Sequence, residues 1–233
     1  MITCGIDIES YDRVKRLYKR YIMPLGLFSE CEQKHINSYQ SATYAFTAKE
    51  AILKAFGSGW FNSEIEPHDI QLEFNDHDIP VDAGFSGKAG DLFKEIGSPF
   101  TSLVFHQLGG DILATYTMSD SFVGSLDAGL VAISRPNLSV VNVYTMQAIH
   151  TEKTMGMSAC STRSLGELAI NLAIQECCDV KTGAYESGRV GKNKDGAPHW
   201  DFYSGHDEHD NNKEIAISIT HNKQHICGIA LGK

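Results

Sequence analysis

The stretch Thr43-Tyr-Ala-Phe-Thr-Ala-Lys-Glu-Ala-Ile-Leu-Lys-Ala-Phe-Gly57 gives the clearest structural signal in the chain. Small and apolar residues recur in it at helical spacing and predict a buried stripe on a helix over residues 43–56; they are Ala45, Ala48, Ile52 and Ala55. Gly57 is suited to end this helix, because glycine readily adopts the left-handed conformation that follows a last turn. Glu50 and Lys54 stand off the stripe, one turn apart, with Lys49 beside them. On a surface such a pair would add only about 0.2–0.5 kcal/mol to the helix, so any larger role depends on the rest of the chain.

Length and composition bound the class of protein. A chain of 233 residues with 42% hydrophobic and 21% charged residues is typical of a globular protein with one large or two small domains. The net charge of −9 argues against nucleic-acid binding by the whole chain. The N-terminus lacks the pattern of a signal peptide, and no apolar run approaches the roughly 20 residues of a membrane span. With six scattered cysteines that lack metal-type spacing, we expect a cytoplasmic protein with reduced thiols.

The order of predicted elements repeats along the chain. The first half predicts a strand, a basic helix, the central helix, a strand, a helix and a hairpin, at residues 2–8, 11–22, 43–56, 70–74, 86–96 and 102–116. The second half predicts two strands, a helix, a loop to about residue 200 and a hairpin, with the regular elements at residues 130–133, 139–144, 161–174 and 215–231. We therefore predict an α+β fold of two similar halves, each a three-stranded antiparallel sheet with helices, paired as a pseudo-dimer. The predicted boundaries are 1–118 and 128–233, with a small, polar linker at 119–127.

Direct residue matches support the repeat. They pair Gly5 with Gly129, Phe46 with Arg163, Glu50 with Glu167, and His106 with His221. The halves differ in their polar residues in a complementary way. Asp7 and Glu9 have apolar counterparts in the second half, whereas Arg163 and the polar hairpin end Ser218-Ile-Thr-His221 occur there alone. This pattern predicts one composite site, with carboxylates from the first half and Arg163 and His221 from the second.

Three carboxylates in the first half form a hard, oxygen-rich set: Asp7, Glu9 and Glu50. Such a set suits Mg²⁺, which is bound by few protein carboxylates together with phosphate oxygens. Lysine, arginine and histidine side chains around such a metal are typical of a pyrophosphate site.

These motifs resemble those of the 4′-phosphopantetheinyl transferases along nearly the whole chain. Holo-acyl-carrier-protein synthases, the single-domain branch, begin with a Gly-Ile-Asp strand and an Asp-Arg basic helix and continue with a Phe-x-x-Lys-Glu-Ala-x-x-Lys helix; residues 5–7, 12–13 and 46–54 match. The two-domain branch, typified by the surfactin synthetase activator, carries Gly-Ile-Asp-Ile-Glu, as residues 5–9 do here. Its other half has an Arg-Ser-Leu-Leu-Gly-Glu helix and an Asn-Ile-Ser-His-Ser hairpin, similar to residues 163–167 and 218–222. That half comes first in the two-domain branch and second here, so the order of the halves is swapped.

The resemblance implies an enzyme, a holo-[acyl-carrier-protein] synthase. It would transfer 4′-phosphopantetheine from coenzyme A to a serine of an apo carrier protein of fatty acid, polyketide or nonribosomal peptide biosynthesis. The reaction would depend on Mg²⁺ and release adenosine 3′,5′-bisphosphate. Carried over residue by residue, Asp7, Glu9 and Glu50 would bind the metal, and Glu50, Lys54 and Asp7 would be the catalytic residues. Glu50, directly or through a metal-bound water, would remove the serine proton, and Lys54 would contact the phosphates. Coenzyme A would be bound by Lys49, Lys54, Arg163, Lys194, Thr220 and His221.

The chain departs from the family pattern at two positions. Ala197 replaces a loop lysine, with Lys192 and Lys194 close by, and Ala45 stands where the single-domain enzymes usually have arginine, which Arg163 would replace. Neither departure removes a predicted metal ligand.

The basic helix predicts a surface for a partner. Arg13, Arg16 and Arg20 share one face of it, which taken alone is a solvated helix face. The carrier proteins that the resemblance implies are acidic helical bundles, so we predict that these arginines dock one. A pseudo-dimer completes its site without a second chain, so we expect a monomer.

Two other functions fit parts of the pattern. One is a catalytically degenerate protein that binds coenzyme A or a carrier protein, which the loss of the loop lysine leaves open. The other is a Mg²⁺-dependent nucleotide-phosphate hydrolase that shares only the carboxylates. Two further features have simpler interpretations: residues 206–210, His-Asp-Glu-His-Asp, as a solvated loop, and His106 as a packed histidine.

Overall fold

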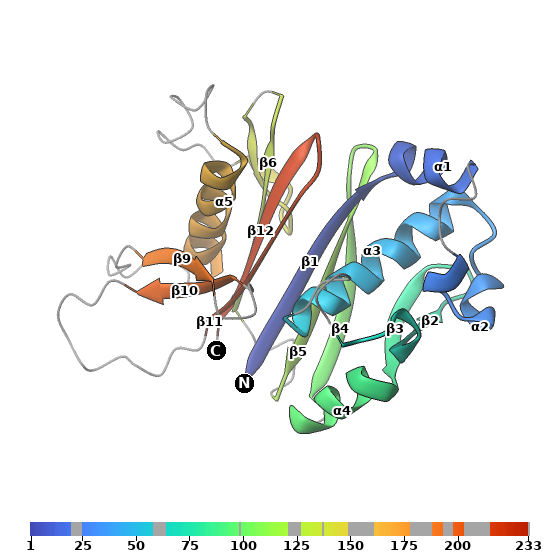
Figure 1. The fold of residues 1–233 in the computed structure, drawn as a ribbon. Helices are drawn as coiled ribbons and strands as arrows, with labels where there is room; N and C mark the ends of the chain where they lie inside the picture. The colour runs from blue at the N-terminus through green and yellow to red at the C-terminus, as the bar shows by residue number, and fades with distance from the viewer. Residues whose placement is uncertain are drawn as a thin grey trace. The chain divides into compact units, whose positions relative to one another are not determined.

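The computed structural model shows a mixed α+β protein (Figure 1). It describes residues 1–19, 25–57, 64–97, 99–120, 127–136, 138–148, 161–177, 188–192, 198–202 and 215–232. Residues 5–123 form one compact unit, and residues 124–233 together with the first four residues form another. Among the described residues, no helix combines the length and the apolar character that crossing a membrane requires. The predicted α+β class with antiparallel hairpins is confirmed.

The first unit packs a central helix on a three-stranded sheet with strand order β1-β5-β4 (Figure 1). A second sheet consists of the antiparallel pair β2 and β3, which also contacts the central helix, α3. The elements in chain order are β1 (Ile2–Ser10), α1 (Tyr11–Lys19), η1 (Leu25–Leu27), α2 (Glu30–Gln33), α3 (Tyr39–Ala55), η2 (Pro67–Asp69), β2 (Ile70–Phe74), β3 (Pro80–Phe85), α4 (Gly87–Glu95), β4 (Phe100–Leu108) and β5 (Asp111–Ser119).

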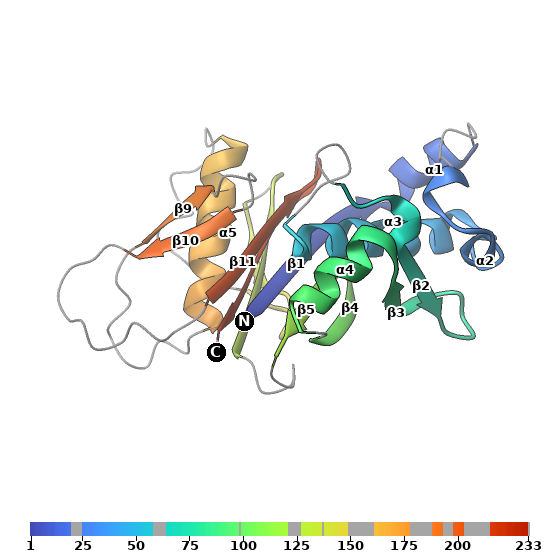
Figure 2. The same cartoon turned by 60° about the horizontal axis from the view of Figure 1, so that its bottom comes forward.

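The second unit repeats this plan around one long helix, α5. Its elements are β6 (Asp127–Ser134), β7 (Val140–Asn142), β8 (Gln147–Ala148), α5 (Thr162–Cys177), β9 (Gly188–Lys192), β10 (Pro198–Phe202), β11 (Ile215–His221) and β12 (His225–Gly232). The sheet has the order β11-β12-β6-β7-β8, so β6, β12 and β11 correspond to β1, β5 and β4. The pair β9–β10 lies beside α5 and β11 (Figure 2).

The second unit differs from its prediction in two respects. Its sheet has five strands rather than three, because β7 and β8 extend it beyond β6. The segment expected to be a loop up to about residue 200 contains β9 and β10. Both strands are short, and β9 contains Gly188 and Gly191, a residue type that is depleted in strands. For these reasons the sequence pattern did not predict the two strands.

The ends of α3 follow from local sequence. Ser38 is the N-cap, and its hydroxyl accepts the N–H of Ser41, while the Ser41 hydroxyl accepts the N–H of Ser38. Gly57 has a φ of 75° and its N–H donates to the Lys54 carbonyl, so it ends the helix as predicted. The helix begins at Tyr39 rather than at residue 43, because the cap lies one turn before the apolar stripe.

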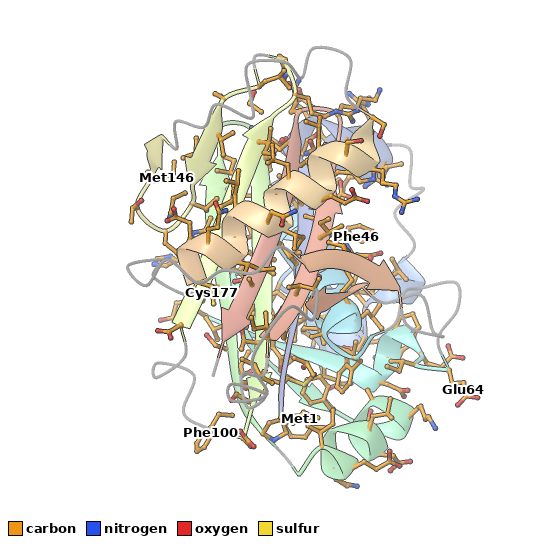
Figure 3. The ribbon with its side chains drawn as sticks, turned by 90° about the vertical axis from the view of Figure 1, so that its left-hand side faces the viewer. Met1, Phe46, Glu64, Phe100, Met146 and Cys177 are labelled. Carbon is orange, nitrogen blue, oxygen red and sulfur yellow. The ribbon has the colours of Figure 1, made fainter. Side chains whose placement is uncertain are left out.

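A strand and a helix approach each other very closely at Gly5. A Cβ atom added there would lie 1.9 Å from the carbonyl oxygen of Ala51 and 2.5 Å from the nitrogen of Ala55. Gly129 has the same relation to α5: an added Cβ would lie 1.8 Å from the carbonyl oxygen of Ala173 and 2.7 Å from the nitrogen of Cys177. Figure 3 shows α5 crossing its strands, with Cys177 at the end of the helix. Only glycine allows two backbones to approach so closely.

These contacts correct the alignment of the repeat. The Gly5 and Gly129 contacts make Ala51 equivalent to Ala173, which shifts the helices by five residues relative to the sequence match. In the first hairpin, Leu108 pairs with Asp111 across a two-residue turn. In the second hairpin, the N–H of Asn222 donates to the carbonyl of His225, also across two residues. Asn222 therefore corresponds to Leu108. The corrected pairs are Glu50 with Leu172, Ser41 with Arg163, His106 with Thr220, and Gln107 with His221. At low sequence identity, short motifs can be aligned in several registers, whereas the backbone contacts at Gly5 and Gly129 allow only one register of strand and helix.

We predict that Gly5→Ala and Gly129→Ala each lower the free energy of unfolding by about 2–4 kcal/mol, because the methyl group would meet backbone atoms that cannot move aside. Urea unfolding followed by circular dichroism measures the change. Gly110→Ala is the matched control: no atom lies within 4 Å of its added Cβ, so we expect a change below about 0.5 kcal/mol. Equal stability of Gly5→Ala and Gly110→Ala would contradict the close contact.

Candidate active site

Two carboxylates of β1 face helix α3. Asp7 and Glu9 alternate with the intervening residues and lie on the same side of the strand as Gly5, which touches α3. Both are buried, with exposed fractions of 7% and 8%. Buried carboxylates require a counter-charge or hydrogen bonds, so their partners define the site.

Lys54 of α3 is the partner of Asp7. Its Nζ lies 2.7 Å from Asp7 Oδ1 and donates to the carbonyl oxygen of Ile6 at 3.1 Å. The Lys54 side chain is 28% exposed, so its ammonium group joins the buried carboxylate to solvent. This ion pair puts the predicted residues Asp7 and Lys54 together.

Arg13 of α1 forms a short ion pair with Glu9. The backbone N–H of Arg13 donates to Ser10 Oγ at 3.0 Å, which holds the first turn of α1 against the end of β1. Arg13 was predicted to dock a carrier protein, but this contact makes it a member of the carboxylate cluster. Sequence reasoning missed this contact. Glu9 and Arg13 have the i, i+4 spacing of a helical ion pair, but Glu9 lies on a strand, where this spacing does not predict a contact.

Glu50 is the third carboxylate, on the half-buried side of α3. Burial and the negative charge of Asp7 together raise the pKa of Glu50 to about 7, although the positive charge of Lys54 opposes them. Burial also raises the pKa of Glu9, which the hydrogen bond from Arg13 opposes. Among the described residues, none forms an ion pair with Glu50. A carboxyl with a pKa near neutrality is suited to accept a proton at physiological pH.

The cluster fits a divalent cation by the chemistry of its donors. The negative charge of Asp7 raises the pKa of both Glu9 and Glu50, which shows a repulsion among the three carboxylates that a divalent cation would relieve. No group of three or more His, Cys, Asp or Glu side chains in the described part of the chain is already arranged to hold a metal. Lys54 and Arg13 instead neutralise Asp7 and Glu9, so binding a metal requires these carboxylates to exchange a cationic partner for it.

Lys49 occupies a position that disagrees with its predicted role in binding coenzyme A. Its side chain has no exposed surface. Its ammonium group donates to the carbonyl oxygens of Leu27 (2.8 Å) and Pro67 (2.9 Å) and to Glu32 Oε2 (2.9 Å). Since an ammonium group has three hydrogens, these bonds leave none for a ligand. We therefore assign Lys49 to the structure of the first unit.

Glu32 completes this buried network. Its Oε1 accepts the N–H of Leu72 at 2.9 Å, and its Oε2 accepts the N–H of Ser29 at 2.6 Å. The pair of Glu32 and Lys49 thus joins α2, α3 and β2. Burial lowers the pKa of Lys49, and the charge of Glu32 opposes that change.

Two predicted residues of the second unit, Arg163 and His221, lie near the same end of α5. Arg163 is in its first turn, highly exposed, with Nε 3.0 Å from Glu167 Oε1. His221 is exposed at the end of β11, and alternation along the strand puts it on the α5 side together with Ile219. A Cβ added at Gly166, one turn after Arg163, would lie 3.0 Å from the Ile219 side chain.

Thr220 differs from its prediction as a coenzyme A ligand. Its side chain is buried and lies on the opposite face of β11 from His221. Arg16 is exposed on α1, as a docking residue must be. Arg20, Lys194, Ala197 and residues 206–210 lie outside the described residues.

Comparison with known families identifies the segment that contains the carboxylate cluster. The model of the 4′-phosphopantetheinyl transferase superfamily matches residues 3–94. The chain is similar to a holo-[acyl-carrier-protein] synthase of Natranaerobius thermophilus, with 33% identity over 105 residues that cover 42% of this chain and 80% of that protein. It is also similar to a holo-[acyl-carrier-protein] synthase of Ruminiclostridium cellulolyticum, with 30% identity over 101 residues that cover 40% and 74%.

Solved structures of the same kind of protein also match. The holo-[acyl-carrier-protein] synthase of Helicobacter pylori, in complex with coenzyme A, is 26% identical, with a TM-score of 0.41 over 51% of this chain and 100% of that chain. The enzyme from Neisseria meningitidis is 23% identical, with a TM-score of 0.42 over 51% and 99%.

We predict that Lys49→Met lowers the free energy of unfolding by about 3–5 kcal/mol, because Glu32 would keep a buried charge without its ammonium partner. The double variant Lys49→Met, Glu32→Gln should recover part of this loss, since it removes the charge as well. Urea unfolding of both proteins measures the difference. A small loss of stability in Lys49→Met, with a large loss of coenzyme A affinity in the folded protein, would restore the ligand role.

We also predict that stability depends on pH through Glu50. Its pKa in the folded protein is about 7, above the ordinary value of 4.5. Below pH 4.5 the carboxyl is protonated in both states; between pH 4.5 and about 7 the unfolded state ionises first, so stability falls as the pH rises. Glu50→Gln cannot ionise, so above pH 7 the metal-free variant should be more stable than the native protein by about 1–3 kcal/mol.

Urea unfolding in EDTA at pH 4.5 and at pH 8 measures this difference. It should be close to zero at the lower pH, and since Glu9 is present in both proteins its own pKa shift cancels. A Glu50→Gln variant that is less stable than the native protein at pH 8 would contradict the burial of an ionisable carboxyl.

Proposed function

Because this chain belongs to the 4′-phosphopantetheinyl transferase superfamily, we propose that it transfers 4′-phosphopantetheine from coenzyme A to a serine of an apo carrier protein. The observation that carries the proposal is the cluster of buried Asp7 with partly exposed Lys54 and Glu50, which lies within the matched segment. The holo-[acyl-carrier-protein] synthases to which the chain is similar support carrier protein and coenzyme A as the two substrates.

In the proposed reaction Glu50 is the general base. The serine oxygen attacks the β-phosphorus of the coenzyme A pyrophosphate, the bond from that phosphorus to the bridging oxygen breaks, and adenosine 3′,5′-bisphosphate leaves. The serine proton passes to Glu50, whose pKa of about 7 matches this task at neutral pH. Burial of Glu50 therefore has a function, although it costs stability.

Cationic side chains stabilise the charge that develops on the phosphates. In the absence of a metal, Asp7 and the Ile6 carbonyl hold the Lys54 ammonium group beside the carboxylates. Mg²⁺ held by Asp7, Glu9 and Glu50 would supply further positive charge to the pyrophosphate oxygens. When Glu9 and Asp7 bind the metal, Arg13 and Lys54 become available to the phosphates.

We assign the nucleotide end of coenzyme A to residues of the second unit. Arg163 and His221 are exposed near one end of α5, which suits them to grip a phosphate such as the 3′-phosphate. Lys194 is proposed to contribute a further positive charge. The buried side chain of Thr220 is no longer part of this set.

A carrier protein is proposed to dock on α1. Arg16 is exposed there, and Arg20 follows it by one helical turn in the sequence. Arg13 lies between this surface and Glu9, so a carrier protein on α1 would present its serine close to the carboxylate cluster.

The test is intact-mass analysis of a panel of apo carrier proteins incubated with the enzyme, coenzyme A and Mg²⁺. We expect a mass gain of one phosphopantetheine group on at least one carrier. Glu50→Gln should lower the rate at least about 100-fold, as loss of a general base does. His221→Ala should raise the KM for coenzyme A about 10-fold with little change in kcat, because it removes binding common to ground and transition states.

Two variants separate the parts of the proposal. Lys94→Met, which removes an exposed charge from α4, is the control and should match the native rate. Arg16→Glu should raise the KM for the carrier protein and leave that for coenzyme A unchanged. Binding of coenzyme A without transfer to any carrier would identify the chain as a catalytically degenerate binding protein, and release of free phosphate in the absence of carrier would indicate a hydrolase.

A further inference from the structure

Arg135 bridges two loops of the second unit. It follows β6 directly and is half-buried. Its Nη1 donates to the carbonyl oxygen of Asn222 at 3.1 Å, and its Nη2 donates to Thr162 Oγ1 at 3.0 Å. Its backbone N–H donates to the carbonyl oxygen of Gln224 at 2.7 Å. One residue thus connects the end of β6, the first turn of α5 and the β11–β12 turn.

The two residues that Arg135 holds are sequence neighbours of the proposed ligands. Asn222 follows His221, and Thr162 precedes Arg163. The turn is itself ordered, because Asn222 Oδ1 accepts the N–H groups of Gln224 (2.7 Å) and His225 (2.8 Å). Arg135 therefore fixes an ordered turn to the start of the helix.

We propose that Arg135 is a positioning residue for coenzyme A: it sets the spacing of His221 and Arg163 for a phosphate of the nucleotide. This inference rests on the proposed function. Both ligands are exposed and lie on different elements, so their spacing depends on a connection between those elements. A phosphate bound by two side chains requires that spacing to be correct before it arrives, since binding energy otherwise goes into ordering the loops.

In the first unit, a different residue type connects the corresponding strand end, turn and helix. The backbone N–H of Tyr11 donates to the carbonyl oxygen of Gly110 at 3.1 Å, so Tyr11 is the counterpart of Arg135. The Tyr11 ring makes edge contacts with Tyr39 and Tyr44 of α3, at 6.4 and 6.5 Å between ring centroids. The Tyr11 hydroxyl also donates to the Tyr44 hydroxyl at 3.4 Å. The side chain at this position thus reaches the helix through ring contacts and one long hydrogen bond in the first unit, and through a guanidinium group in the unit that carries His221.

A guanidinium group is chemically suited to this position. It presents several N–H groups in a fixed plane and can reach two acceptors at once, whereas a lysine ammonium group is a point charge on a flexible stem. Arg135→Lys therefore keeps the charge and removes the bridge. Thr162→Val is milder, since it removes one acceptor and keeps the shape of the side chain.

The experiment compares these variants with the native enzyme in the carrier-protein assay and by calorimetric titration with adenosine 3′,5′-bisphosphate. We expect Arg135→Lys to raise the KM for coenzyme A and the Kd for the bisphosphate by about 5- to 30-fold, as loss of a charged hydrogen bond does. Thr162→Val should raise both by about 2- to 5-fold. In every variant kcat and the KM for the carrier protein should stay within about twofold, and Lys94→Met should leave all constants unchanged.

A double variant distinguishes positioning from general destabilisation. If Arg135 acts through His221, then Arg135→Lys should weaken bisphosphate binding much less in the His221→Ala background than in the native background. Full additivity, or an unchanged KM for coenzyme A in Arg135→Lys, would overturn the positioning role while transfer by the native enzyme upheld the proposed function. A native enzyme that neither transfers the group nor binds the bisphosphate would overturn both.

Discussion

The contact between Gly5 and the backbone of α3 determines the arrangement of the candidate site. With no Cβ between them, β1 and α3 meet at Ala51 and Ala55, and their relative register has almost no freedom. Asp7 lies two residues beyond Gly5 on the same face, and Lys54 lies between Ala51 and Ala55, the two α3 residues at the contact. Their charged groups are therefore 2.7 Å apart without either side chain reaching across a gap. Because Glu50 precedes Ala51, the same contact brings it within the field of Asp7, which helps to raise its pKa.

The second constraint is the buried pair of Lys49 and Glu32, which acts on the other side of α3. Removing two charges from water costs several kcal/mol per ion, and the structure offsets this with hydrogen bonds to every ammonium hydrogen and to both carboxylate oxygens. Such a fully bonded network is directional, since each partner must be in place for the others to be satisfied. Adjacent residues Lys49 and Glu50 thus point to different environments. Lys49 anchors the helix to α2 and β2, and Glu50 faces the site.

The sequence was sufficient for features that depend on one element and insufficient for those that depend on the packing of several. The stripe of small residues predicted α3, and the glycines at residues 5 and 129 indicated equivalent strands. Helical periodicity does not reveal that both sides of α3 are covered, so Lys49 was interpreted as a ligand when it is buried. The short motifs also could not predict how the two halves align. Glu167 is the same residue type as Glu50, but the residue that structurally corresponds to Glu50 lies five positions after Glu167. The contact of Arg13 with Glu9 depends on the direction in which the chain turns from β1 into α1. The pattern of either segment by itself does not predict that direction. The metal ligands and the nucleotide ligands as a set remain predictions, since each was argued from residue type and exposure.

The corrected alignment explains how one frame supports two roles. The positions of Asp7, Glu9 and Glu50 in the first unit are those of Val131, Ile133 and Leu172 in the second, and these three belong to its hydrophobic core. A buried carboxylate lowers stability unless it is neutralised, whereas an apolar residue there adds to the core. The second unit is therefore apolar at these three positions between strand and helix, and its Arg163 and Arg135 lie at the start of α5 and at the end of β6 that is bonded to it. At that end Arg135 makes two hydrogen bonds from one guanidinium group, where Tyr11 has ring contacts and one long hydrogen bond to Tyr44. Aromatic packing tolerates small displacements of a turn, but two hydrogen bonds from one rigid group do not. Arginine in place of tyrosine is thus what we expect where the spacing of the exposed side chains of Arg163 and His221 matters more than the burial of apolar surface.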